Sequence, residues 1–223
     1  MIDIPEAQFE SIRAGYHELA NFHFDRWVEA FKNTDWLPAI EKLHSTLGDA
    51  FAAKAIADIY ETKDSEAIKF LAMLIWGYSS AGYGPHRARA IFDTTRLTEV
   101  LVNVNVSSID KIVESYELHK RIHGIGPAFF TKHLYFIGLA NKAELIPVIF
   151  DNQVAAGLLR LACGGGKIFE LVQVTPKISA EAYRDYVLWC NRQASLINAA
   201  GPTTKAINAG HIERHIFELG ATR

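Results

Sequence analysis

The organisation of this chain is decided by the stretch Arg121-Ile122-His123-Gly124-Ile125-Gly126-Pro127-Ala128-Phe129-Phe130-Thr131-Lys132-His133-Leu134-Tyr135-Phe136. Gly124 and Gly126 allow positive φ values and leave the backbone bare, as a tight turn requires. Pro127 suits the first turn of a helix, where its fixed φ fits and no backbone N–H is needed. The stretch therefore predicts two helices joined by a glycine hairpin.

Such a hairpin directs unpaired backbone N–H groups outward at the positive end of a helix dipole, which suits one phosphate group. The pattern resembles the helix-hairpin-helix element of base-excision DNA glycosylases. The resemblance implies DNA contacts from His123, Gly124, Ile125 and Gly126. It implies no cofactor beyond a monovalent or divalent cation at the hairpin on DNA binding. A plain connection between two core helices is the alternative, because short Gly-x-Gly motifs also arise by chance.

The helix that follows the hairpin carries one lysine among apolar residues. Ala128 and Phe129 lie one turn before Lys132, and Tyr135 and Phe136 lie one turn after it. The helix is apolar nearly all round, so we expect it to be buried. Lys132 then either extends along the aromatic side chains to solvent or lies in a partly dry pocket, where its free amine would act as a nucleophile.

An apolar run, Ile146-Pro147-Val148-Ile149-Phe150, leads to Asp151 at the start of a further helix, Asn152 to about Leu161. Asp151 is a good N-cap residue, and a capping aspartate can also face a cleft. This order of elements resembles that of the 8-oxoguanine glycosylase branch, in which an essential aspartate follows the hairpin. The spacing of 19 positions between Lys132 and Asp151 is similar to that branch. One departure is that the lysine of that branch follows the hairpin almost directly, where this chain has Ala128.

A second informative stretch is Trp76-Gly77-Tyr78-Ser79-Ser80-Ala81-Gly82-Tyr83-Gly84-Pro85-His86-Arg87. Its glycines and proline predict a loop, after which Pro85 begins a helix through Phe92. Aromatic residues beside His86 and Arg87 suit stacking on bases and contacts to phosphates. The Trp-Gly-Tyr and Gly-Tyr-Gly-Pro pattern resembles bacterial proteins of the 8-oxoguanine-glycosylase-like fold. A structural interhelix turn is the alternative.

Length and composition predict one globular unit. The chain has 223 residues, 49% of them hydrophobic, and no long low-complexity tract, so it can bury a sizeable core. The fold class we expect is all-α, a two-lobed helix-hairpin-helix glycosylase-like bundle. Residues 1–105 with 175–223 would form one lobe, and residues 106–174 would form the other, with the hairpin and Asp151.

The rest of the sequence predicts further helices and two connecting segments between them. Helices are expected over 5–31, 36–47, 49–60, from Asp64 or Ser65, from Ser107, over 178–199, and from Thr203 or Thr204 to Leu219. Residues 163–167 predict a flexible turn, and Lys167 to Val174 a short strand or an extended link. No strand alternation is evident in the first 60 residues.

Cysteine usage and hydropathy exclude several classes. Cys163 and Cys190 are too few and lack CxxC spacing, so we expect no zinc site and no iron–sulfur cluster. The longest apolar run, Phe70 to Trp76, is too short to cross a membrane, and no export signal is evident. The expected protein is cytoplasmic and nucleoid-associated, with no membrane contact and no obligate protein partner.

The net charge of −2 argues against a protein that coats DNA through bulk charge. It is compatible with a grip on a few phosphates by backbone N–H groups and a local basic strip. The residues expected to form this strip around the hairpin are Lys111, His119, Lys120, Arg121, His123, Lys132 and His133.

The resemblance implies a DNA glycosylase that flips a nucleotide out of double-stranded DNA and breaks the bond between base and sugar. Asp151 would stabilise the cation-like sugar. Lys132 would attack the anomeric carbon to give a Schiff base and AP lyase activity, or water would attack if Lys132 is out of place. No metal is expected. The residues expected around the extruded base are Trp76, Tyr78, Tyr83, Phe129 and Tyr135, with His86 and Arg87 on the DNA.

Oxidised guanine is the usual substrate of that branch, and a hypermodified phage base, excised in an antiviral defence role, is a second hypothesis. The excised base, the presence or absence of strand cleavage after base release, and the oligomeric state are left open by the sequence. Two readings from other classes stay open. One is a non-catalytic helix-hairpin-helix DNA-binding module, and the other is a helical protein–protein adaptor.

Overall fold

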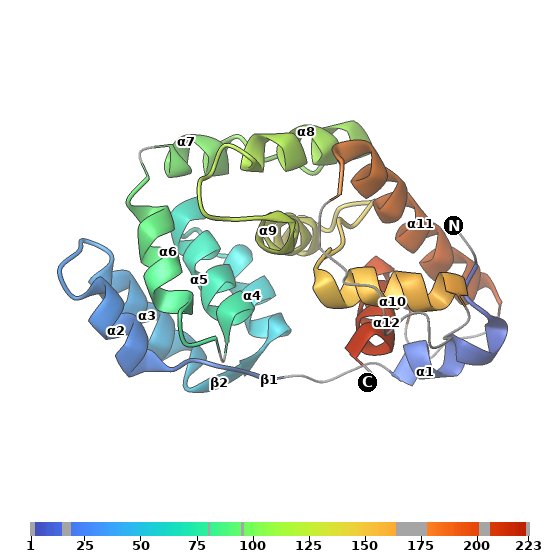
Figure 1. The fold of residues 1–223 in the computed structure, drawn as a ribbon, viewed down its shortest axis with the longest axis horizontal. Helices are drawn as coiled ribbons and strands as arrows, with labels where there is room; N and C mark the ends of the chain where they lie inside the picture. The colour runs from blue at the N-terminus through green and yellow to red at the C-terminus, as the bar shows by residue number, and fades with distance from the viewer. Residues whose placement is uncertain are drawn as a thin grey trace.

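The computed structural model describes residues 3–14, 19–79, 81–94, 96–163, 178–200 and 206–221, and in these residues the fold is all-α with one minor sheet, as the sequence predicts (Figure 1). The elements in chain order are η1 (Glu6–Gln8), α1 (Phe9–Ala14), β1 (Leu19–Asn21), α2 (Phe24–Phe31), α3 (Leu37–Leu47), β2 (Ala50–Ala52), α4 (Ala53–Tyr60), α5 (Glu66–Tyr78), α6 (Gly84–Phe92), α7 (Leu97–Val102), α8 (Ile109–His119), α9 (Pro127–Ala140), α10 (Asn152–Cys163), α11 (Ala180–Ala199) and α12 (Ala209–Ala221).

Helix α9 lies at the centre of the molecule and is seen nearly end-on in Figure 1. Helices α2 to α7 gather at one end, and α1 with α10, α11 and α12 gathers at the other. The side chains of Phe130, Leu134 and Phe136 on α9 are buried, which fits its apolar sequence. The loop that leads from α8 into α9 lies beside α6 in Figure 1, and a Cβ at Gly124 in this loop would lie 3.4 Å from Ile91 of α6. The division of the chain into lobes at residues 105 and 175 stays a prediction.

The N-terminal part corrects the prediction of one helix over residues 5–31. Its described residues form η1, α1, β1 and α2 instead. Strand β1 pairs antiparallel with β2, with Ala20 opposite Phe51 and both side chains buried. Three-residue strands are too short to show a period of two in the sequence. The predicted helix over residues 49–60 accordingly begins only at Ala53, after β2.

Helix α5 corrects the prediction of a loop from Trp76, because the helix continues through Tyr78. A side chain at Gly77 would place its Cβ 2.9 Å from a ring carbon of Phe129 and 3.4 Å from Cδ of Lys132. Gly77 is therefore a helical residue that lets α5 pack closely against α9. The N-cap of α5 is Ser65, whose hydroxyl accepts from the backbone N–H of Ile68.

Helices α10 and α12 cross at very short distance. A Cβ at Gly157 would lie 1.9 Å from the carbonyl oxygen of Ile216, and one at Gly220 would lie 1.9 Å from that of Gln153. Helix α12 begins at Ala209, later than Thr203 or Thr204, which lie outside the described residues together with Lys167 to Val174. No described helix has the length and apolar character needed to span a membrane.

Candidate active site

The hairpin joins α8 to α9 as predicted, although its two glycines differ. Helix α8 is capped by Ser108, whose hydroxyl accepts from the backbone N–H of Lys111. Gly124 has a φ of +90°, which other residues rarely adopt. Gly126 has an extended backbone with φ −127°, so the expectation of a positive φ was wrong for this residue. It is Gly124 that makes the turn.

The hairpin backbone carries unpaired donors. Among the described residues, the N–H groups of His123, Gly124, Ile125 and Gly126 donate to no acceptor, and His123 and Gly124 are exposed. The side chain of Ile125 is partly buried and packs against the hydrophobic core, which anchors the turn. These donors precede the first turn of α9, at the positive end of its dipole. The arrangement can bind one phosphate group without a charged side chain.

The basic strip expected around the hairpin is present only in part, since four of its seven members are exposed and three are buried. Lys111 pairs with Glu114 at 2.5 Å, and Lys120 pairs with Glu117 at 2.5 Å. Both lysines are therefore compensated by carboxylates on the same helix. Of the other members, His119 and His133 are fully buried, Lys132 is 9% exposed, and Arg121 and His123 are exposed.

The two buried histidines bond to each other between α8 and α9. His119 Nδ1 lies 2.6 Å from the carbonyl oxygen of Ser115, and His119 Nε2 lies 2.8 Å from His133 Nδ1. Burial lowers the pKa of His119 to about 4. Burial, with His119 and Lys69 nearby, lowers the pKa of His133 well below its usual value. With both rings neutral, His119 donates to Ser115 and accepts from His133, so the pair locks the two helices behind the hairpin.

Lys132 and Asp151 meet at the N-terminus of α10. Lys132 Nζ lies 3.3 Å from Asp151 Oδ2, with the two side chains 11% and 17% exposed. The other carboxylate oxygen, Oδ1, accepts from the backbone N–H of Val154 at 3.0 Å. Asp151 is thus an N-cap and an ion-pair partner at once, with one oxygen for each task. Both side chains are mostly buried, and each keeps a small exposed fraction.

Aromatic side chains of α5 and α9 surround the ammonium group of Lys132. Its Nζ lies 5.8 Å from the ring centroid of Trp76 and 5.8 Å from that of Phe129. The carboxylate and the two rings all stabilise a positive charge at this position. The predicted residue Tyr135 lies elsewhere, since its hydroxyl would stand 2.6 Å from a Cβ at Gly210 of α12.

A row of rings leads from Phe129 to the surface. The rings of Phe129 and Tyr78 have centroids 4.4 Å apart, and those of Tyr78 and Tyr83 are 6.2 Å apart. Tyr83 is 57% exposed, and the guanidinium carbon of Arg87 lies 4.5 Å from its ring centroid. Tyr83 is therefore a surface residue rather than a wall beside Lys132, and its exposed ring can stack on a base.

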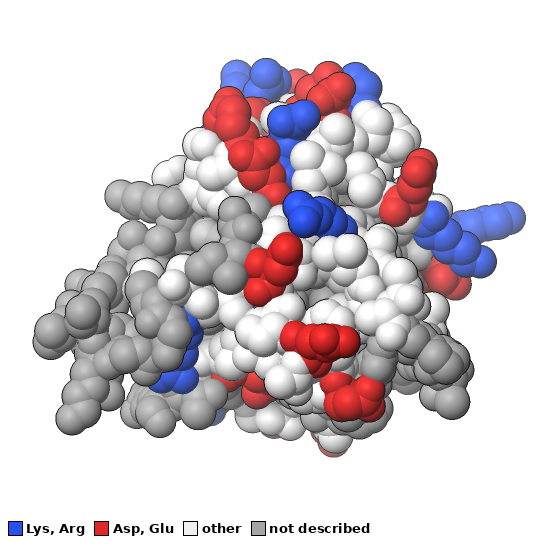
Figure 2. Space-filling view, turned by 90° about the vertical axis from the view of Figure 1, so that its right-hand side faces the viewer, with Lys and Arg blue, Asp and Glu red and all other residues white. Residues whose placement is uncertain are grey.

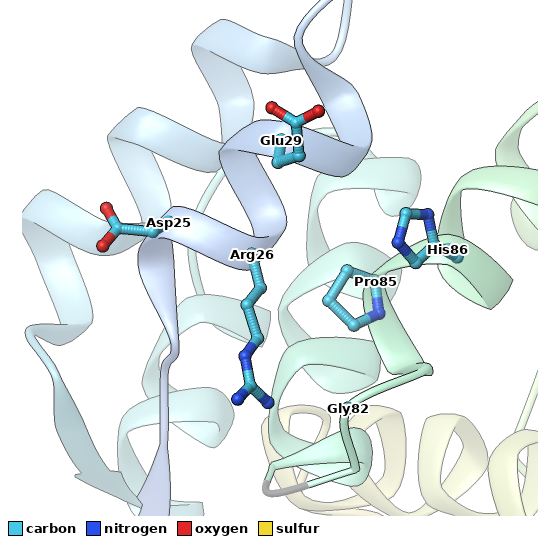
Figure 3. A pocket seen from close by; sticks show the side chains of 6 residues that line it. All are labelled: Asp25, Arg26, Glu29, Gly82, Pro85 and His86. Carbon is cyan, nitrogen blue, oxygen red and sulfur yellow. The ribbon is translucent and has the colours of Figure 1, made fainter.

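The surface next to Tyr83 contains a cation that sequence reasoning missed. A pocket of about 380 Å³ between α2 and α6 is lined by Asp25, Arg26, Glu29, Gly82, Pro85 and His86 (Figure 3). Arg26 extends toward Gly82, and its Nη1 would stand 3.5 Å from a Cβ there. Asp25 points away from the pocket in Figure 3. No local signal marks Arg26, because only the fold brings α2 to this loop.

The end of the molecule formed by α11 and its neighbours has a different character. Figure 2 shows acidic and basic side chains interspersed on this face. Arg192 lies 3.6 Å from Asp3, and Arg184 lies 3.8 Å from Asp185, so these cations have carboxylate neighbours. Among the residues that the structure describes on this face, cations and carboxylates alternate rather than forming a continuous basic surface.

The described part of the chain contains no group of three or more His, Cys, Asp or Glu side chains that could hold a metal ion.

Comparison with known proteins identifies the family. No curated protein and no solved structure gives a significant match to the chain. A family model with the description "Putative 8-oxoguanine DNA glycosylase OGG-like protein" matches residues 17–217. The match includes the hairpin, the lysine and the aspartate of the site. The chain belongs to this OGG-like family of DNA glycosylases, enzymes whose substrate is DNA.

Proposed function

We propose that this protein excises a modified base from double-stranded DNA, with Lys132 as the nucleophile and Asp151 as the carboxylate beside the sugar. The observation that carries the proposal is the 3.3 Å contact between Lys132 Nζ and Asp151 Oδ2. Lys132 lies five residues into α9 from Pro127, about 7.5 Å along the helix axis. At about 3.4 Å per nucleotide, this is roughly two steps of a DNA strand whose phosphate is held by the hairpin.

The chemistry follows from the two groups. As the bond between C1′ and the base nitrogen breaks, the base leaves with the electron pair and the sugar becomes cation-like. The Asp151 carboxylate stabilises this charge. Lys132 transfers a proton to Asp151 Oδ2 and forms a bond from Nζ to C1′. Opening of the sugar at the C1′–O4′ bond, with a proton to O4′, gives a Schiff base. The base anion that left with the electron pair then takes a proton from C2′, the C3′–O bond breaks, and the 3′ phosphate leaves with that electron pair, which cleaves the strand.

The extruded base would enter over the aromatic side chains near Lys132. Trp76 and Phe129 each lie 5.8 Å from Nζ and present apolar surface on two sides of it. A flipped base is held in such sites by stacking between aromatic side chains. Tyr78, at 4.4 Å from Phe129, extends this surface toward the loop. The site does not select among bases by its aromatic residues alone, because every base has a π-face.

The DNA backbone would lie across the hairpin and the start of α6. A Cβ at Gly124 would lie 3.4 Å from Ile91, which stands one helical turn after Arg87 on α6. The unpaired N–H groups of the hairpin and the exposed Tyr83–Arg87 pair therefore belong to neighbouring parts of the surface. Arg26 adds a cation beside them, and the exposed His86 adds a further polar side chain. Phosphate contacts of this kind position the duplex, and Tyr83 can stack where a nucleotide has been extruded.

Borohydride trapping tests the proposal. The substrates are duplexes with one 8-oxoguanine, together with genomic and phage DNAs that contain hypermodified bases. The wild-type protein is expected to release a base and form a covalent adduct that is absent in Lys132→Ala. Release of a base from phage DNA only would assign the activity to antiviral defence rather than repair.

Other outcomes have distinct meanings. Base release that continues in Lys132→Ala without an adduct, and stops in Asp151→Asn, would assign the attack to water. Salt-sensitive DNA binding without release from any of these DNAs would replace the proposal with a DNA-binding module. Absence of DNA binding would leave the protein–protein adaptor.

A further inference from the structure

The segment before Asp151 is buried but belongs to neither a helix nor a sheet. Pro147, Val148, Ile149 and Phe150 are all buried, and their backbone takes part in no ladder of hydrogen bonds. Buried backbone N–H and C=O groups need partners, because an unsatisfied group costs about 1–3 kcal/mol. For the N–H groups of Ile146 and Phe150 and the carbonyls of Ile146, Val148 and Ile149, the partners are side chains.

Helix α11 supplies the partners on one side. The side-chain amide of Asn191 accepts from the N–H of Ile146 at 3.1 Å and donates to its carbonyl at 3.0 Å. The hydroxyl of Tyr183 donates to the carbonyl of Val148 at 2.9 Å, and that of Tyr186 donates to the carbonyl of Ile149 at 3.3 Å. Tyr183 and Tyr186 are one helical turn apart, so they hold two successive carbonyls.

Helix α9 supplies the partner on the other side through Thr131. Its Oγ1 accepts from the backbone N–H of Phe150 at 3.0 Å and donates to the carbonyl of Pro127 at 2.6 Å. The residue is fully buried. Among the described residues, this hydrogen bond is the one that joins α9 to residues 146–150. The next residue after each of its two partners, Lys132 after Thr131 and Asp151 after Phe150, belongs to the ion pair of the site.

We propose that Thr131 is a positioning residue that sets the separation of Lys132 and Asp151, with Tyr183 and Tyr186 holding the same segment from α11. The inference rests on the proposed function of that pair. One hydroxyl fixes the residue before the nucleophile to the residue before the carboxylate, so a change at Oγ1 shifts both groups relative to each other. It also ties the position of Asp151 to the first turn of α9, through the carbonyl of Pro127.

The dual role distinguishes Thr131 from an ordinary helical threonine. The hydroxyl of Thr46 on α3 donates to the carbonyl of Lys42 at 3.0 Å, which is the usual bond to the preceding turn. Among the described residues, no backbone N–H donates to the Thr46 hydroxyl. Thr46→Val is therefore a matched control, which removes the same kind of donor bond and no link between segments.

The experiment compares Thr131→Val, Thr131→Ser and Thr46→Val in the full chain. Valine keeps the shape of threonine and loses both hydrogen bonds, whereas serine keeps both.

Base release is measured in single turnover at saturating protein, and affinity is measured with a duplex that carries a tetrahydrofuran abasic analogue. Thr131→Val is expected to slow release by about 10- to 100-fold, because a misplacement on the order of 1 Å has that effect, with affinity nearly unchanged. Thr131→Ser and Thr46→Val are expected to release the base at close to the wild-type rate.

A second readout needs no reaction. The amide proton of Val154 donates to Asp151 Oδ1, so its hydrogen exchange reports where the carboxylate lies. Exchange should become faster in Thr131→Val and stay at the wild-type rate in Thr131→Ser. If Thr131→Val does not fold, Tyr183→Phe and Tyr186→Phe carry the test, since each removes one hydroxyl and keeps the ring.

The outcomes separate the two proposals. Wild-type release and wild-type Val154 exchange in Thr131→Val would overturn the positioning role. If the wild-type protein itself releases no base, the proposed function fails, and the exchange of Val154 still decides whether Thr131 holds Asp151.

Discussion

The hairpin of residues 120–126 and the segment of residues 146–150 are alike in several respects. Both are non-helical, both lie outside the sheet, and both lead directly to a residue of the Lys132–Asp151 pair or its helix. They differ in what their backbone groups bond to. The hairpin has N–H groups with no acceptor among the described residues, whereas the segment is bonded to the side chains of Thr131, Tyr183, Tyr186 and Asn191.

The difference follows from burial. A backbone N–H that faces water costs little to leave unpaired within the protein, and it stays available for a phosphate. A buried one must be satisfied from within, which fixes the chain in one position. The exposed segment is thus suited to binding DNA, and the buried segment to holding a carboxylate still.

The largest effect is expected at the end of the buried segment, in Asp151→Asn. Asparagine keeps the capping oxygen for the N–H of Val154 and is as good an N-cap as aspartate, so the free energy of unfolding should change little. Base release should fall by about 10²- to 10³-fold, since the charge beside the sugar is lost. Single-turnover kinetics and urea unfolding of the same preparation measure the two quantities. A large loss of stability with unchanged release would show that Asp151 is only a cap.

The next effect concerns the buried histidines behind the hairpin. The pKa of His119 is about 4 in the folded protein against 6.5 as its ordinary value, and that of His133 is also lowered. The unfolded chain therefore binds more protons below pH 6.5. Stability should be unaffected by these groups above that pH and should fall as the pH drops from 6.5 to 5, by at most about 1.4 kcal/mol per pH unit for each histidine.

Urea unfolding at several pH values measures this slope. His119→Gln keeps an acceptor for His133 and removes one titrating ring, so it should flatten the dependence between pH 6.5 and 5. An unchanged slope in that variant would contradict the burial of a neutral pair.

Local signals were sufficient for the elements next to the site. Pro127 and Gly124 predicted the hairpin and the start of α9, and Asp151 predicted the start of α10, because caps and turns depend on neighbouring residues. The pairing of Lys132 with Asp151 was suggested by a family resemblance, and the 3.3 Å contact agrees with it. The hairpin and the two helix starts are thus encoded within a few residues of where they appear, whereas the Lys132–Asp151 pair joins residues 19 positions apart.

Features that depend on distant parts of the chain were missed or misjudged. His119 and His133 were expected on an exposed basic strip. Both are buried, and their rings form a hydrogen bond between α8 and α9. Gly77 was assigned to a loop, although it serves close packing against Phe129. The sequence did not predict a role for Thr131, since the backbone N–H that its hydroxyl accepts from lies 19 positions away, at Phe150. Spacing along the chain does not show which backbone groups a side chain will reach after folding.

Within the hairpin, the two glycines provide a smaller and sharper test. Gly124→Ala forces a side chain onto a backbone with φ +90°, so we expect a loss of about 1 kcal/mol or more in unfolding free energy. Gly126→Ala should cost less, about 0.5 kcal/mol, because its φ is −127° and nothing lies within 4 Å of a Cβ there, so that the loss is only that of a poorer N-cap. Both are measured by urea unfolding, with affinity for an abasic-analogue duplex in parallel. Equal destabilisation by the two substitutions would show that the turn does not depend on Gly124.

The smallest effect is expected from single cations on the exposed surface, and it tests which face meets DNA. Arg26 makes no ion pair among the described residues and extends toward Gly82, whereas Arg192 on α11 lies 3.6 Å from Asp3. Arg26→Ala should weaken DNA binding several-fold and lower the slope of log affinity against log salt by about 0.9, the value for one phosphate contact. Arg192→Ala should change neither quantity. Fluorescence anisotropy at four salt concentrations measures both, and an equal loss in the two variants would mean that the cations act through net charge rather than through a defined face.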